Sequence, residues 1–446
     1  CSSDLGLEVI QDDAYNVVIK KAGSRGAEDH APVMLQGHMD MVCEKRAGVE
    51  HDFEKDGLDL IIRDGRLTAN GTTLGGDNGV AVALMLMVLD DDEIEHPPVE
   101  CVFTTEEEVG LNGAKALDKS VLKARTMINM DSEDEGVATV SCAGGLRVQF
   151  TKEIQRTTVQ GSLLTLKVEG LLGGHSGQDI DKERQNADLL MARMIQRLLK
   201  ETKGQLVSFN GGTKDNAIPR ECEASLIYES DEEAAKAEEL ACELAETYAE
   251  ELTPAEPDFS CEISCETNRT AEAIPQDAAK EFICAMRLAP NGIQKRNIKM
   301  DGFVVVSLNL GVVRTEEDRI VMIFSPRSSV ASLQEDTKER LNTLAETFGF
   351  TVSHSSEYPG WSFKEDSPVR EICKESYKEL FGEDLKIEAI HAGLECGLFS
   401  DAIKGLDAIA IGPTIANCHT PDEYLTLDSF ERFYEFLKDI LSRLAK

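Results

Sequence analysis

Five short segments place histidine and carboxylate side chains at the ends of apolar runs that we expect to be strands. They are GHMD with His38 and Asp40, LGGDNG with Asp77, TTEEEVG with Glu106 to Glu108, NMDSED with Asp131, and NCHTPDE with His419, which follows the apolar run DAIAIG. In open α/β sheets, ligands collect at the carboxyl ends of the strands. Imidazole and carboxylate are the ligands that zinc prefers, and a carboxylate can bridge two ions. The pattern therefore indicates a metal site, with the candidate ligands His38, Asp77, Glu108, Asp131 and His419.

Taken one at a time, these residues also have structural explanations. An acidic side chain after a strand often caps a helix, and Thr420 with Glu423 would form a capping box. The chain has only eight histidines, however, and several lie in glycine-rich or strand-end motifs, namely His38, His175, His391 and His419. That concentration favours a metal site over unrelated helix caps.

The elements that would position these segments follow an α/β pattern. Between residues 32 and 131, short apolar runs such as VMLQGH, VECVFTT and TMINMD alternate with helical stretches, which is typical of a mainly parallel sheet. The same style returns near the C-terminus, where KIEAI and DAIAIG flank a helix expected near residues 394–401. The last helix places apolar side chains between Phe430 and Leu444 along one face.

The middle of the chain has a different pattern. Long acidic helices, such as one expected from Ser230 to Glu251, alternate with strands, and FVVVSLNLGVV and RIVMIFSP are typical of a hairpin. We expect an α/β catalytic domain in two segments, residues 1–144 and 360–446, interrupted by a large α+β insertion over residues 145–359. The chain opens almost directly on an expected strand pair, EVIQDDAYNVVIKK, so we also expect its N-terminus to be truncated.

Composition narrows the possible partners. The 82 acidic against 46 basic side chains give a formal net charge of −36, which would repel phosphate backbones and anionic membranes. No apolar run approaches the roughly 20 residues that span a bilayer, and the start lacks a signal peptide's basic and apolar regions. The twelve cysteines form no CxxC pair and are expected to be reduced. These features predict a cytoplasmic protein with neither nucleic-acid nor membrane partners.

The order of the motifs carries a resemblance. GHMDMV, LGGDNGVA, EEEVG, INMDSE, GGHSG and HTPDE resemble the metallopeptidase family that includes aminoacylase, carboxypeptidase G and carnosinase, and the resemblance covers essentially the whole chain. The pairing of INMDSEDEG with a long insertion and the late HAGLECG segment favours the branch of aminoacyl-histidine, or cytosolic nonspecific, dipeptidases. The resemblance implies a parallel-sheet catalytic domain with a lid or dimerisation insertion.

The same resemblance implies two zinc ions, for which Mn²⁺ or Co²⁺ could substitute. Asp77 would bridge the two ions. His38 and Asp131 would complete the protein ligands of one ion, and Glu108 and His419 those of the other.

Two further residues beside the ligands are implied to be catalytic. Asp40 would fix the tautomer of the His38 imidazole. Glu107 would be the general base, which takes a proton from the water shared by the metals and passes it to the departing amine. The resembling proteins often have Asp-Glu-Glu where this chain has three glutamates. Matching the motif from Gly110 backwards places Glu106 at the position that varies, and a register shift of one residue would exchange base and ligand.

Residues of the insertion are implied to complete the site. His175, in LLGGHSGQDID, resembles a histidine that reaches the partner subunit's active site and stabilises an oxyanion, which implies a homodimer through the insertion. Asn216 and Arg327 resemble residues that hold the substrate's C-terminal carboxylate, and the planar arginine fork suits that role. Outside the insertion, Glu395 resembles a residue near the substrate's free amino group. The structural alternatives are a surface turn for His175, a surface ion pair for Arg327 and a purely structural role for Glu395.

The function predicted from these features is zinc-dependent hydrolysis of dipeptides, preferably Xaa-His, with broad tolerance of the N-terminal residue. An N-acyl amino acid amidohydrolase on the same scaffold is the alternative, and Glu395 disfavours it because that enzyme recognises no free amine. A metal-free binding or scaffold protein is also disfavoured, because all candidate ligands and Glu107 are present.

Overall fold

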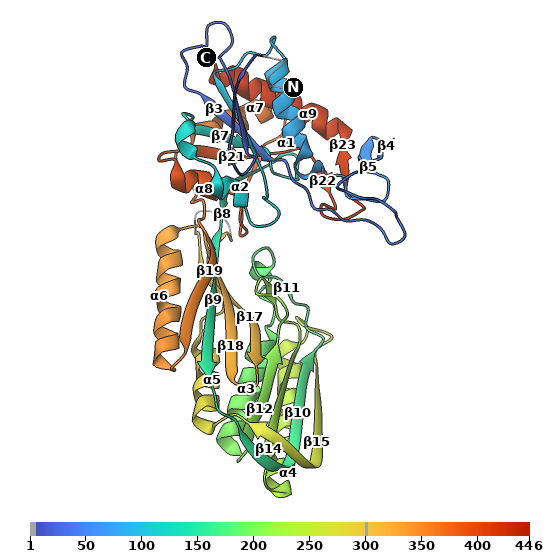
Figure 1. The fold of residues 1–446 in the computed structure, drawn as a ribbon, viewed down its shortest axis with the longest axis vertical. Coiled ribbons are helices and arrows are strands. Elements are labelled where there is room, and N and C mark those ends of the chain that lie inside the picture. Colours follow the sequence, from blue (N-terminus) through green and yellow to red (C-terminus); the bar gives the residue numbers. More distant parts are fainter. Residues whose placement is uncertain (1–5, 299–301) are drawn as a thin grey trace. The chain divides into compact units, whose positions relative to one another are not determined.

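A computed structural model describes residues 6–298 and 302–446 (Figure 1). It divides into two compact units, one formed by Cys1–Cys142 with Gly360–Lys446 and the other by Ala143–Pro359. We call them the α/β unit and the inserted unit. The expected α/β class is confirmed, whereas a lid or dimerisation role for the inserted unit stays a prediction.

The main sheet of the α/β unit has eight strands within the described residues, in the order β1-β2-β6-β3-β7-β21-β8-β20. Their bounds are β1 (Glu8–Gln11), β2 (Val17–Lys21), β3 (Val33–His38), β6 (Val99–Thr104), β7 (Thr126–Asn129), β8 (Val137–Cys142), β20 (Lys386–Ile390) and β21 (Asp407–Ala410). The central strands β6, β3, β7 and β21 are parallel to one another. At one edge, β2 is antiparallel to both β1 and β6, and on the other side β21 meets β8 antiparallel, so the expected parallel sheet is found at the centre of a mixed one.

Helices α1 (Gly76–Asp90), α7 (Pro368–Phe381) and α8 (Glu395–Ala402) contact this sheet directly. The α/β unit has two further α-helices within the described residues, α2 (Asn112–Ala116) and α9 (Leu427–Leu444). A Cβ at Gly37 of β3 would lie only 2.3 Å from the Ala81 Cβ of α1, so glycine is needed where this helix meets the strand. This close approach brings the start of α1 beside His38, the last residue of β3. Within the described residues, no helix of either unit combines the length and apolar character needed to cross a membrane.

A small sheet with the order β22-β23-β5-β4 also belongs to the α/β unit. Its strands are β4 (Leu60–Arg63), β5 (Arg66–Ala69), β22 (Ile415–Ala416) and β23 (Tyr424–Thr426). His419 lies on the loop between β22 and β23. The histidine follows the strand of DAIAIG, as expected, but not immediately: that strand ends at Ala410, before Gly412 and Pro413, and the separate short strand β22 intervenes.

The inserted unit contains one large antiparallel sheet with the order β15-β10-β14-β12-β17-β18-β9-β19, and β16 pairs with β17. The strands are β9 (Gly144–Glu153), β10 (Thr157–Glu169), β12 (Gln205–Gly211), β14 (Cys222–Tyr228), β15 (Ser260–Ala273), β16 (Gly292–Arg296), β17 (Val304–Thr315), β18 (Arg319–Ser328) and β19 (Thr351–Tyr358). Its helices are α3 (Ala187–Glu201), α4 (Asp231–Leu252), α5 (Gln276–Leu288) and α6 (Ala331–Thr347), and a short pair joins β11 (Gly174–His175) to β13 (Ala217–Ile218). The expected hairpin is confirmed as β17 and β18, and the expected acidic helix as α4.

Candidate metal site

The candidate ligands of the α/β unit converge on Asp77. His38 Nε2 lies 3.1 Å from Asp77 Oδ1 and 3.5 Å from Asp131 Oδ1. On the other side, His419 Nε2 lies 3.1 Å from Asp77 Oδ2 and 2.9 Å from Glu108 Oε1. These residues form two groups of donor atoms, each within 4.8 Å of one another, that share the Asp77 carboxylate, and Asp77 also lies in a third such group with Glu133 and Cys418.

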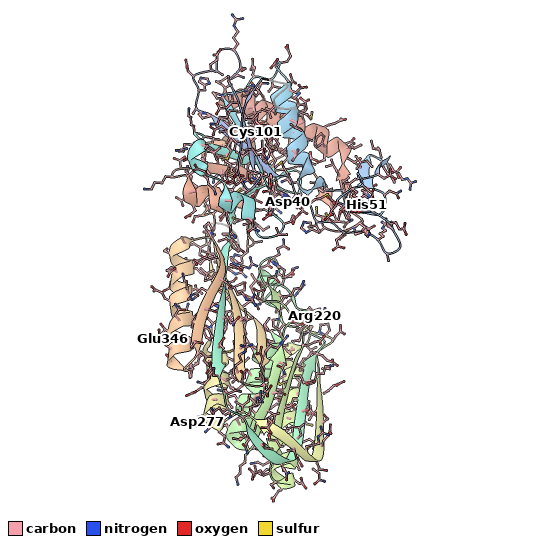
Figure 2. The ribbon with its side chains drawn as sticks, viewed as in Figure 1. Asp40, His51, Cys101, Arg220, Asp277 and Glu346 are labelled. Atoms are coloured by element: carbon pink, nitrogen blue, oxygen red, sulfur yellow. The ribbon has the colours of Figure 1, made fainter. Side chains whose placement is uncertain are left out.

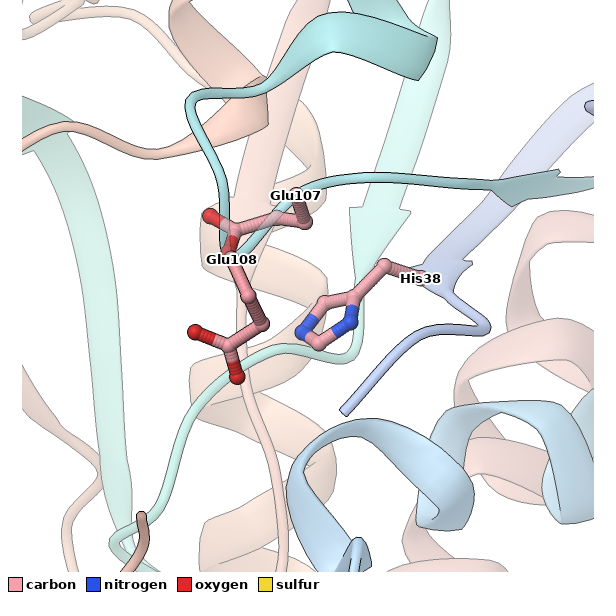
Figure 3. A group of neighbouring side chains, drawn as sticks. All are labelled: His38, Glu107 and Glu108. Carbon is pink, nitrogen blue, oxygen red and sulfur yellow. The ribbon is translucent and has the colours of Figure 1, made fainter. Parts of the chain in front are cut away.

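The fold explains why residues so distant in sequence meet. His38 ends β3, Asp131 follows β7, and Glu107 and Glu108 lie on the loop after β6, so the carboxyl ends of three neighbouring parallel strands supply them. Figure 3 shows the side chains of His38, Glu107 and Glu108 close together. Asp77 comes from the start of α1, after Gly75, whose φ of 68° is a left-handed conformation that favours glycine. The peptide bond from Asp77 to Asn78 is cis.

Asp40 holds both His38 and the glutamate loop. Its backbone carbonyl lies 3.0 Å from His38 Nδ1, and its carboxylate accepts hydrogen bonds from the backbone N–H groups of Glu107 and Glu108, at 3.1 and 3.2 Å. Figure 2 shows Asp40 in the α/β unit, where Cys101 marks the buried strand β6. An Nδ1–H that donates to Asp40 leaves Nε2 with a free lone pair directed at the ligand cluster.

The three consecutive glutamates have different surroundings. Glu106 has a φ of 52° and its carboxylate accepts a hydrogen bond from Asn112 Nδ2 on the exposed side of the loop. Glu107 and Glu108 form a further donor group with His38, separate from the group of His38, Asp77 and Asp131, and Glu108 also contacts His419. These positions favour the expected register, although the individual roles stay predictions.

The electrostatics of the cluster fit a bound cation. Burial, together with the charge of Asp131, raises the pKa of Glu107 to about 8, and burial likewise raises the pKa of Asp131. The hydrogen bond to Asp77 raises the pKa of His419 to about 9. These raised pKa values show that the crowded carboxylates favour positive charge beside them. A metal cation can supply that charge in place of protons, and the imidazole and carboxylate donors suit zinc.

Two residues with no site role expected from the sequence support the candidate ligands. Asn78 Nδ2 donates to Asp131 Oδ1 at 2.7 Å. Glu423 accepts backbone hydrogen bonds from the segment that leads to Asp77, so it does not form the capping box considered with Thr420. Two sequence features could have pointed to these residues: Asn78 directly follows Asp77, and Glu423 closes the HTPDE motif.

Glu395 is buried at the start of α8. Its Oε2 accepts hydrogen bonds from Gln36 Nε2 at 2.5 Å and from Thr104 Oγ1 at 2.7 Å. Burial raises its pKa to about 7. The expected contact of Glu395 with a substrate amine stays a prediction, and in this structure its partners are side chains of β3 and β6.

The inserted unit brings its own three candidates near one another. The His175 strand pairs with the strand after Asn216, and Ser176 N–H donates to the Asn216 carbonyl at 2.9 Å. Arg327 is buried on β18, donates to the Tyr358 hydroxyl at 2.9 Å, and its positive charge, after burial, helps to lower the pKa of His175. The insertion therefore presents a neutral imidazole beside a guanidinium.

Comparisons with known proteins agree with this site. The model of peptidase family M20/M25/M40 matches residues 34–443. The chain is 34% identical to the cytosol non-specific dipeptidase of Escherichia coli (strain K12) over 449 residues, which cover 99% of this chain and 91% of that relative.

Solved structures show the same relationship. The aminoacylhistidine dipeptidase from Vibrio alginolyticus is 35% identical with a TM-score of 0.94, and the match covers 99% of this chain and 90% of the other. An aminopeptidase from Bacillus cereus shares the fold with a TM-score of 0.55 at 16% identity, covering 100% and 91%. The expected family is confirmed: the chain belongs to peptidase family M20/M25/M40 and is a metallopeptidase.

Proposed function

We propose that the chain hydrolyses dipeptides, preferably Xaa-His, with two zinc ions held by the cluster around Asp77. The observation that carries the proposal is the pair of donor groups that share this one carboxylate, in a chain whose full-length relatives include dipeptidases. His38 and Asp131 would hold one ion, and Glu108 and His419 the other. Such ions, when bound, polarise a carbonyl and lower the pKa of water.

Glu107 is the proposed general base. Its carboxyl group is buried, lies in the donor group with His38, and has a pKa raised to about 8 by burial and by the Asp131 charge. A carboxylate with a pKa near neutrality can accept a proton from the attacking water and later donate it to the leaving amine. Asp40 holds the backbone of this loop, so it fixes where Glu107 can reach.

His175 has the tautomer needed for an oxyanion donor. Its Nδ1 accepts hydrogen bonds from the backbone N–H groups of Gly177 and Gln178, at 3.3 and 3.1 Å. Because Nδ1 is an acceptor, the proton of the neutral ring must be on Nε2, which can donate to a developing oxyanion. We assign the substrate's C-terminal carboxylate to Arg327 and Asn216, whose loop is held by hydrogen bonds from Asn309 to the carbonyls of Asp215 and Ala217.

We further propose that the chain forms a homodimer through the inserted unit, so that His175 acts in the partner's site. The large sheet of this unit ends in β15 and β19, whose outer edges have no strand beside them in the described chain. Long edge strands are ready templates for pairing. Sedimentation velocity would measure the oligomeric state. The name of the Escherichia coli relative supports a cytoplasmic location.

The alternative substrate is an N-acyl amino acid. Purified, zinc-loaded protein should be assayed on a panel of Xaa-His and other dipeptides, each compared with its N-acetylated form. Hydrolysis of the free dipeptides supports the proposal. Hydrolysis of only the acetylated forms would replace it with the amidohydrolase, and Mn²⁺ and Co²⁺ reconstitutions would show which metal gives the highest activity.

A further inference from the structure

A buried carboxylate outside the ligand set gathers four backbone N–H groups. Glu423 is only 2% exposed. Its Oε2 accepts from Leu74 N and Gly75 N at 2.8 and 3.0 Å, and its Oε1 from Gly76 N and Asp77 N at 2.8 and 3.3 Å. Consecutive N–H groups that point at one anion form a strong and directional site.

This contact joins the two segments that carry Asp77 and His419. Glu423 belongs to the loop of His419, between β22 and β23, whereas the donors lead into α1. A Cβ at Gly76 would lie 3.2 Å from Glu423 Oε1, so the contact is closely packed as well as hydrogen-bonded. The hydrogen bonds of Glu423 therefore hold the loop of His419 against the segment of Asp77, and His419 Nε2 lies 3.1 Å from Asp77 Oδ2.

We propose that Glu423 is a positioning residue that presets Asp77 and His419 for the metal ion they share. The inference rests on the proposed two-metal function. The Glu423 clamp, meaning its carboxylate with the N–H groups of residues 74–77, acts on the ion only through these two ligands. Replacing Glu423 with glutamine keeps the shape but substitutes an NH₂ group for one oxygen, which leaves two N–H donors facing another donor.

The α/β unit offers a matched control in Glu100. This residue is 4% exposed, and its carboxylate accepts hydrogen bonds from Lys123 N at 3.0 and 2.9 Å and from Ala124 N at 3.0 Å. It lies near the start of β6, whereas the metal ligands follow the end of that strand. Glu100→Gln therefore breaks the same type of contact in the same unit without touching a ligand segment.

The test is zinc binding to the full chain after removal of metal by a chelator, followed by isothermal titration calorimetry. We expect Glu423→Gln to weaken the zinc ion held by both Asp77 and His419 by about 10- to 100-fold, the usual effect of losing a support of a ligand, and to weaken the other ion, which shares only Asp77, by a smaller factor. Glu100→Gln should lower the melting temperature of the metal-free protein while both zinc affinities stay at the wild-type values.

Gly76→Ala provides a second variant if Glu423→Gln does not fold. Its added methyl displaces the carboxylate by a few tenths of an ångström and should weaken the same zinc ion by a smaller factor. Wild-type zinc affinities in the folded Glu423 or Gly76 variant would overturn the clamp and leave the proposed function standing. Wild-type protein that binds two zinc ions but cleaves no dipeptide would remove the proposed function. A lower zinc affinity of Glu423→Gln than of wild type would then still support the clamp.

Discussion

Asp188 makes the stability of the inserted unit depend on pH. The residue lies in the first turn of α3, where burial raises its pKa to about 8, and the nearby Cys222 thiol and Arg314 charge offset this only in part. A Cβ at Gly211 would lie 1.6 Å from Asp188 Oδ1, so the carboxyl group is packed directly against backbone. Its protonated form is therefore the one that the folded protein holds below pH 8.

The size of the effect follows from linkage. The unfolded chain ionises an aspartate near pH 3.9, so the folded state holds one more proton between about pH 4 and pH 8. Below that range the contribution of Asp188 to the free energy of unfolding is at its maximum. It falls by about 1.36 kcal/mol for each pH unit as the pH rises toward the folded pKa. Between pH 5 and pH 7 this amounts to a loss of about 2.7 kcal/mol in the free energy of unfolding.

The substitution Asp188→Asn removes this proton. Its free energy of unfolding relative to wild type should rise by about 2.7 kcal/mol between pH 5 and pH 7, measured by urea denaturation followed by circular dichroism. Asp277→Asn, at an exposed position of α5 in the same unit, is the control and should leave the wild-type slope in place (Figure 2). A constant difference between wild type and Asp188→Asn across this range would refute the reasoning.

Three further predictions concern the chemistry. Glu107→Gln should lower kcat at least about 100-fold while two zinc ions remain bound, as measured by steady-state kinetics and elemental analysis, and retained kcat would remove its role as base. His175→Ala should lower kcat by about 100- to 1,000-fold with little change in KM, since one oxyanion donor is lost, and a purely raised KM would point to substrate binding instead. Arg327→Met should raise KM for a dipeptide far more than for its C-terminal amide, and equal effects on both substrates would contradict carboxylate recognition.

The α/β class and the gathering of acidic and imidazole residues could be predicted because they follow from local pattern. Buried apolar runs such as β3, β6 and β7 define parallel strands, and candidate ligands such as His38 and Asp131 lie where β3 and β7 end. The separate hairpin of β17 and β18 was equally visible, because its two apolar runs flank a short polar turn.

The supporting contacts could not be predicted, because they depend on three-dimensional proximity between distant segments. The sequence shows Glu423 beside Thr420, which suggests a local cap, whereas its four hydrogen bonds run to residues 74–77. Glu395 shows the same limit: its contacts with Gln36 and Thr104 arise only when the start of α8 lies beside β3 and β6 in the folded chain. His419 was recognised as a ligand type, but its loop belongs to a small sheet whose short strands carry little periodicity.

The central claim is tested most directly by titrating zinc into chelator-treated protein while measuring hydrolysis of an Xaa-His dipeptide, with Glu107→Gln in parallel. The account predicts no activity without metal, full recovery at two zinc ions per chain, and almost none in the variant at the same zinc content. Undiminished hydrolysis in the metal-free protein, or none by folded wild-type chains carrying two zinc ions, would contradict it.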